Sequence, residues 1–147
     1  MATHDYYRLQ QGSIPNMKPG ANAVWIRVDF RLMPGAAGDT YNLMEVNNHW
    51  IVKHGFYRVT YDGGVATATF DVQAVGANDM TAAIDIDRGD DVMTRFTAVD
   101  DDAPVAITAD GFITGTLNTK AAGDGVIDLF FVIVVAPGDE EITNLGE

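Results

Sequence analysis

The sequence contains no cysteine and only one serine, Ser13. Without thiols the chain has no disulfide framework, no thiolate zinc site and no cysteine nucleophile. The lone serine lies outside any Gly-x-Ser-x-Gly elbow, which argues against a serine hydrolase. Walker A and Gly-x-Gly-x-x-Gly patterns are also missing, so the sequence has neither of the usual phosphate-binding loops of nucleotide-binding proteins.

Basic side chains are scarce. The chain has 9 Lys and Arg against 21 Asp and Glu, a formal net charge of -12 at pH 7. Such an excess of negative charge repels phosphate backbones and anionic lipid headgroups. We therefore expect neither nucleic acid nor a membrane to be a partner.

Long apolar runs are also missing. The longest, residues 126–135, is about half of what a helix needs to cross a bilayer, and it contains Asp128. It predicts a buried strand. The N-terminus lacks the basic start and apolar stretch of a secretory signal, so we expect the chain to begin as the mature protein.

In the clearest segments, apolar residues recur at every second position, which predicts an all-β fold. In residues 24–32 every even position is aliphatic or Phe, and three of the four odd positions are charged. Short segments of this kind, separated by Gly- and Asp-rich turns, are typical of a single antiparallel β-sandwich or jelly-roll-like domain. We predict an extended N-terminal arm without structure of its own (1–22), the β-sandwich domain (23–136) and a polar C-terminal tail (137–147).

Two local features are less regular. The Asp62-Gly63-Gly64 sequence predicts a tight hairpin, because glycine accepts positive φ angles. Residues 78–84 fit either a single helical turn capped by Asp79 or a strand beginning at Met80. We favour the helical turn.

An acidic cluster offers the main alternative chemistry. Its carboxylates lie at the close spacing of a calcium loop, but the register is wrong for an EF-hand and no helices flank it. Aspartates are also common turn residues, so solvated turns are favoured over a cation site. His49 and His54 are five residues apart and would face opposite sides of one strand. We therefore predict no cofactor and no metal, with weak candidate ligands at Asp85, Asp87, Asp90 and Asp91.

Aromatic and arginine side chains outside the expected core indicate protein contacts. Such residues are enriched at the centres of protein interfaces. Trp25 shares the charged side of the first long strand with Arg27 and Arg31, although it could equally lie beneath the arm. The arm carries a second group, and the predicted interface residues are Tyr6, Tyr7, Arg8, Leu9, Trp25, Arg27 and Arg31.

A wider pattern resembles the small β-sandwich head decoration, or cement, proteins of tailed bacteriophages. The similar segments are residues 42–46 (Asn-Leu-Met-Glu-Val), 50–59, 64–72 (Gly-Val-Ala-Thr-Ala-Thr-Phe-Asp-Val), 79–85, 108–114 and 122–130. Asn47-Asn48 stands where the family has Pro-Ala, and Ala74 replaces a glycine.

The resemblance implies a structural virion protein on the exterior of the head, without catalysis. It would decorate and stabilise the capsid as a homotrimer that binds the major capsid protein across neighbouring shell subunits. An arm without its own structure would lie on such a neighbour, so deleting residues 1–20 should abolish capsid binding and leave the sandwich folded.

The alternative is an exterior virion or tail knob that binds carbohydrate or a receptor, with calcium held by the aspartate loops. A glycan hydrolase would need two carboxylates beside a cleft and is least favoured.

Overall fold

The computed structural model describes residues 2–8, 11–13, 17–32, 35–61, 68–75, 79–87, 91–99, 103–118 and 125–135, except the side chains of residues 8, 11–13 and 79. In chain order the elements are β1 (Thr3–His4), the 3-10 helix η1 (Tyr6–Arg8), β2 (Gln11–Ser13), β3 (Gly20–Asp29), β4 (Thr40–Val46), β5 (Ile51–Tyr61), β6 (Thr69–Gln73), β7 (Asp79–Asp85), β8 (Thr94–Arg95), β9 (Val105–Ala106), β10 (Gly111–Asn118) and β11 (Val126–Val135). Among these residues no helix is long and apolar enough to cross a membrane.

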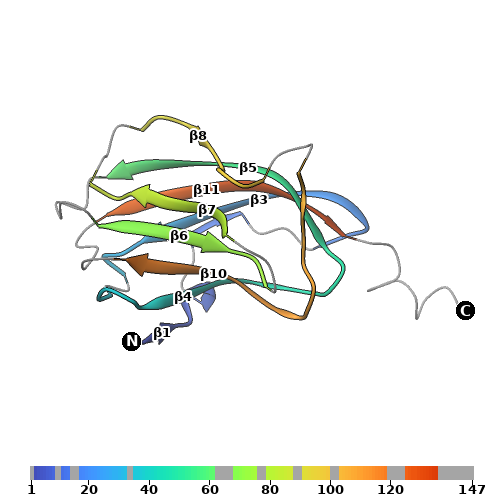
Figure 1. Cartoon of the computed structure of the whole chain (residues 1–147), viewed down its shortest axis with the longest axis horizontal. Coiled ribbons are helices and arrows are strands. Elements are labelled where there is room, and N and C mark those ends of the chain that lie inside the picture. The colour runs from blue at the N-terminus through green and yellow to red at the C-terminus, as the bar shows by residue number, and fades with distance from the viewer. Residues whose placement is uncertain are drawn as a thin grey trace, which may run out of the picture.

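The strands form two sheets that pack as a sandwich (Figure 1). A five-stranded sheet has the order β1-β4-β10-β6-β7, and a six-stranded sheet has the order β2-β3-β11-β5-β8 with β9 also paired to β5. All pairings are antiparallel except that of β1 with β4. The expected all-β, antiparallel sandwich is confirmed.

The core lies between the sheets and follows the predicted alternation. On β3 the even residues Val24, Ile26 and Val28 are buried, as is Phe30 just after the strand. The pattern ends earlier than predicted, because residues 30–32 turn away from the sheet and Leu32 is 45% exposed.

Aromatic rings fill one part of this core, where Phe30 lies edge-on to both Tyr41 and Phe70. Gly115 of β10 makes room for them, because a Cβ there would stand 1.9 Å from Cζ of Phe70.

The expectation of an N-terminal arm without structure of its own is wrong. β1 extends the five-stranded sheet, β2 extends the six-stranded sheet, and β3 begins at Gly20, within the expected arm. Tyr6 is fully buried; its hydroxyl donates to the Arg27 carbonyl at 3.0 Å and accepts from the Asp29 N–H at 2.6 Å. β1 and β2 are too short to show an alternating pattern, which is why the sequence did not reveal them.

Asp39 fixes the start of the chain to the sandwich. Its carboxylate accepts from the N–H of Ala36 at 2.9 Å, from His4 Nε2 at 2.9 Å and from the N–H of Ala2 at 2.7 Å. These bonds to the charged form hold the pKa of Asp39 well below its usual range.

Two other local expectations have different outcomes. Residues 79–85 form strand β7 beside β6 rather than a helical turn, because their N–H and C=O groups pair in a sheet with register shifts. The hairpin expected at 62–64 and the polar tail at 137–147 lie outside the described residues.

Candidate functional site

The outer face of the six-stranded sheet carries a charged row across its three central strands. Asp128 of β11 lies opposite Arg27 of β3 and Arg58 of β5. Arg27 donates from Nε and Nη2 to the two carboxylate oxygens at 2.7 and 2.9 Å, and Arg58 donates from Nε at 3.0 Å. We call these three residues the charged row.

Within the charged row, the carboxylate of Asp128 offsets one of the two arginine charges, which leaves a net charge of +1. Asp128 is fully buried, although it belongs to the outward side of its strand. Burial acts to raise its pKa, but the hydrogen bonds from Arg27 and Arg58 outweigh that effect and hold the pKa below its usual value. The hydrogen bonding between Arg27 and Asp128 also raises the pKa of the Arg27 guanidinium.

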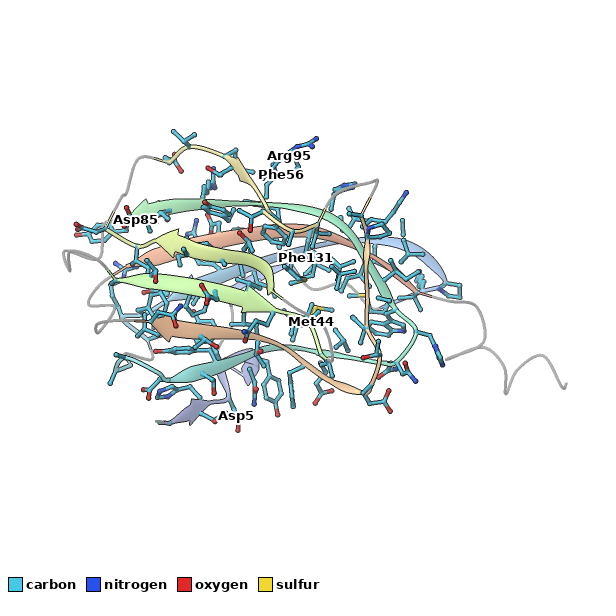
Figure 2. The ribbon with its side chains drawn as sticks, in the orientation of Figure 1. Asp5, Met44, Phe56, Asp85, Arg95 and Phe131 are labelled. Carbon is cyan, nitrogen blue, oxygen red and sulfur yellow. The ribbon has the colours of Figure 1, made fainter. Side chains whose placement is uncertain are left out.

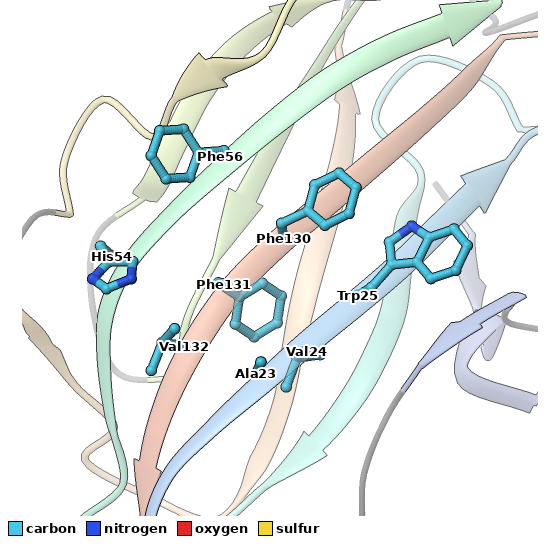
Figure 3. Close-up of a pocket in the computed structure, with 8 residues that line it drawn as sticks. All are labelled: Ala23, Val24, Trp25, His54, Phe56, Phe130, Phe131 and Val132. Carbon is cyan, nitrogen blue, oxygen red and sulfur yellow. The ribbon is translucent and has the colours of Figure 1, made fainter.

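Two residues further along β11, an aromatic row crosses the same three strands. Phe130 pairs with Trp25 of β3 and with Phe56 of β5. The rings of Trp25 and Phe130 are parallel within 5°, with centroids 6.1 Å apart. Figure 3 shows the ring of Phe130 between those of Trp25 and Phe56, which together we call the aromatic row.

Guanidinium groups lie over the aromatic row. Those of Arg27, Arg58 and Arg95 are 5.6, 5.5 and 5.8 Å from the ring centroids of Trp25, Phe130 and Phe56 respectively. Cation–π contacts of this kind contribute about 0.5–1 kcal/mol at exposed sites. They place delocalised positive charge directly beside apolar surface.

Beside the aromatic row lies a shallow hollow of about 270 Å³. Its lining is nearly all apolar and also includes one imidazole (Figure 3); the residues are Ala23, Val24, Trp25, His54, Phe56, Phe130, Phe131 and Val132. A concave apolar surface with a few placed polar groups is the usual form of a binding site. The outer face therefore combines an apolar hollow with a border of arginines.

The structure brings together only some of the predicted interface residues. Trp25 and Arg27 lie on the outer face of β3, with β2 beside them in the same sheet rather than above Trp25. Arg31 lies in the turn after β3, where Nη2 donates to Asp29 at 2.7 Å and the guanidinium is 5.5 Å from the ring of Tyr61.

The other predicted residues lie elsewhere. Tyr6 is in the core and is not available for an interface. Tyr7 packs against Phe112 of the five-stranded sheet, with ring centroids 5.1 Å apart. Arg8 is the last residue of η1, and the structure describes its backbone only. Leu9 lies outside the described residues.

Of the weak metal candidates, the described Asp85, Asp87 and Asp91 have contacts of another kind. The Asp85 carboxylate accepts a turn hydrogen bond from the N–H of Asp87 at 3.0 Å. Oδ1 of Asp91 lies 3.6 Å from Nε of Arg58. Asp90 is outside the described residues. Within the described part of the chain no three His, Asp or Glu side chains gather in a way that could hold a metal ion.

Sequence reasoning missed five members of this face: Phe56, Arg58, Arg95, Asp128 and Phe130. One signal was available, because an aspartate inside an apolar strand requires a cationic partner to be buried. Which arginine would supply it depends on the pairing of β11 with β3 and β5, and a single sequence does not give that pairing.

Comparisons with known proteins support the fold. No protein-family model and no curated protein matches the chain. Among solved structures it is similar to a chain from the acidic stable capsid structure of Helicobacter pylori bacteriophage KHP30, with 12% identity over 86% of this chain and 93% of that chain and a TM-score of 0.53. A second similar chain, from the capsid of Ralstonia phage GP4, has 19% identity over 91% and 96% and a TM-score of 0.45. The first likeness shows that this sandwich fold also occurs in a phage capsid structure.

Proposed function

We propose that this protein is a structural, non-enzymatic component of a tailed-phage virion that decorates the exterior of the head. In this proposal it is a homotrimer that binds the major capsid protein across neighbouring shell subunits and stabilises the shell. The fold shared with a chain of a phage capsid structure supports the proposal, as does the resemblance of residues 42–136 to head decoration proteins.

The observation that carries the proposal is the outer face of the six-stranded sheet. Trp and Arg are the residue types most often found at the energetic centres of interfaces. Here strand pairing sets the three residues of the aromatic row side by side, and hydrogen bonds to Asp128 hold the guanidinium groups of Arg27 and Arg58. Such preorganised groups lose little conformational entropy on binding.

Add-back of the protein to purified heads that lack it tests this role. Wild-type protein should cosediment with the heads, and removing a central interface aromatic typically costs 2 kcal/mol or more, about 30-fold in affinity. We expect Trp25→Ala and Phe130→Ala to lose binding to that extent. Thr114→Ala and Thr116→Ala, at half-buried positions of β10 in the other sheet, are matched controls that should bind normally.

Deleting residues 1–20 does not serve as a test of the arm, because it would remove Tyr6 from the core. Unchanged binding of both aromatic variants would show that another surface meets the shell. Failure of the wild type to cosediment would contradict the decoration role itself. Saturable heat with calcium or a glycan panel would instead favour the exterior knob.

A further inference from the structure

Charge is distributed unequally between the two sheets of the sandwich. The strands of the six-stranded sheet contain four cations, Arg27, Lys53, Arg58 and Arg95. The strands of the five-stranded sheet contain no Lys or Arg but four acids, Glu45, Asp71, Asp79 and Asp85. The six-stranded sheet is therefore a local exception in a chain whose net charge is -12. Its outer face suits a negatively charged partner, because complementary potentials favour association.

Two of the four cations are not engaged by a carboxylate. Arg27 and Arg58 both bind Asp128, whereas Lys53 and Arg95 are exposed. Within the described part of the chain, neither Lys53 nor Arg95 makes a side-chain hydrogen bond or an ion pair. Arg95 extends outward beyond Phe56 (Figure 2), with its guanidinium 5.8 Å from the ring centroid. Its N–H donors therefore remain available to a carboxylate from outside the chain.

Lys53 and Arg95 flank the hollow along β5. Arg95 lies over Phe56, which lines the hollow, and Lys53 precedes His54, which also lines it. Lys53 is the extra residue of a register shift, because Val132 pairs with His54 and the next residue of β11 already pairs with residue 52. The hollow of about 270 Å³ is smaller than the roughly 300–1,000 Å³ of typical small-molecule sites. Its size and apolar lining suit one apolar side chain of a protein partner.

We propose that the outer face binds an acidic segment of the shell subunit, with one apolar side chain in the hollow and carboxylates beside Arg95 and Lys53. This inference rests on the proposed function, because it takes the shell as the partner. It also orients the molecule, since the five-stranded sheet, with Glu45 and Asp85 exposed, then faces away from the shell. Packed sheets are about 10 Å apart, and the Debye length is about 10 Å at 0.1 M salt, so the acids of the far sheet are largely screened from the shell.

Rates of binding to immobilised heads that lack the protein test this partner. Charges at the border of an interface act mainly on the association rate and its salt dependence, whereas changes at the apolar centre act on the dissociation rate. Raising the salt from about 0.1 M to about 1 M shortens the Debye length from about 10 Å to about 3 Å and should slow wild-type association about 10-fold. Lys53→Gln with Arg95→Gln should slow association about 10-fold at the lower salt and remove most of its salt dependence. Phe130→Ala should speed dissociation and keep the salt dependence.

Matched variants separate a local charge from the net charge. Glu45→Gln with Asp85→Asn alters two exposed charges of the other sheet and should leave the salt dependence as in wild type. Combining these two substitutions with the Lys53/Arg95 pair restores the net charge of -12, and this quadruple variant should associate as slowly as the Lys53/Arg95 double variant. Because all four residues are exposed, urea denaturation should show the stability of wild type in each variant.

The possible failures are distinguishable. Wild-type association that is independent of salt, or a Lys53/Arg95 variant that keeps the wild-type salt dependence, overturns the acidic partner and leaves the decoration role in place. Recovery of the association rate in the quadruple variant overturns it as well, because net charge alone would then explain the effect. A change in the sedimentation of the isolated Lys53/Arg95 variant would identify a second copy as the occupant. Wild-type protein that does not bind heads at any salt contradicts the proposed function and this partner together.

Discussion

Replacing Asp128 with asparagine tests how much the charged row contributes to stability. The carboxylate is fully buried and accepts hydrogen bonds at 2.7 and 2.9 Å from Arg27 and at 3.0 Å from Arg58. Removing one partner of a buried ion pair costs about 3–5 kcal/mol. Because the two arginine side chains remain 34% and 32% exposed, water replaces part of the lost interaction. We therefore expect the lower end, a loss of about 3 kcal/mol in the free energy of unfolding.

Urea denaturation followed by circular dichroism measures this loss. With a slope of about 2 kcal/mol per molar urea, the midpoint should fall by about 1–2 M. Asp91→Asn is the matched control, because Asp91 is 62% exposed and 3.6 Å from Arg58, where an ion pair contributes about 0–1 kcal/mol. A loss below about 1 kcal/mol for Asp128→Asn, or one no larger than that of the control, would refute the reasoning.

Three further predictions concern the core and pH. Gly115→Ala forces a Cβ against Phe70 and should cost about 1–3 kcal/mol in urea denaturation, with partial recovery in the double variant that also carries Phe70→Leu. Tyr6→Phe leaves the buried Asp29 N–H without its acceptor and should cost about 1–3 kcal/mol by the same assay. Because the folded-state pKa of Asp128 is lowered, its contribution is complete above the unfolded pKa of about 3.9 and is lost as the pH falls through the folded value. Acid titration of stability should therefore be less steep in Asp128→Asn than in wild type.

Each of these three predictions has its own control or contradicting result. Full stability of Gly115→Ala would mean that the backbone of β10 shifts away from the ring. Tyr61→Phe is the control for Tyr6, because Tyr61 is 54% exposed and its hydroxyl loss should change stability little. Equal acid sensitivity of Asp128→Asn and wild type would assign the acid response to other carboxylates.

Long strands with one buried face could be predicted from the sequence, because apolar and polar residues that alternate over many positions fit a strand and do not fit a helix. β3 is the clearest example, with its even residues in the core. β1 and β2 contain only two and three residues, and their pairing comes from neighbouring strands and from the burial of Tyr6. The error at β7 has the same origin, since propensity near Asp79 did not reveal its pairing with β6.

The candidate site shows a similar limit. Trp25 and Arg27 could be assigned to one strand face because both belong to the same alternating segment. Phe130 and Phe56 come from segments more than 25 residues away in sequence, and only the register of β11 against its two neighbours brings them into one row. Local sequence therefore identified one strand of the face, and tertiary pairing supplied the other two.

The sandwich geometry limits how the proposed homotrimer is assembled. The outer faces of the two sheets point in opposite directions (Figure 1), so a contact between one outer face and the opposite face of the next copy would repeat as an open stack. A contact of the hollow with the hollow of a second copy would close as a dimer. A three-fold ring needs contact patches inclined to each other, and those are found at sheet edges or loops. In the proposed function, a homotrimer built in that way would leave the aromatic row uncovered on all three copies, so that three weak contacts with the shell would act together.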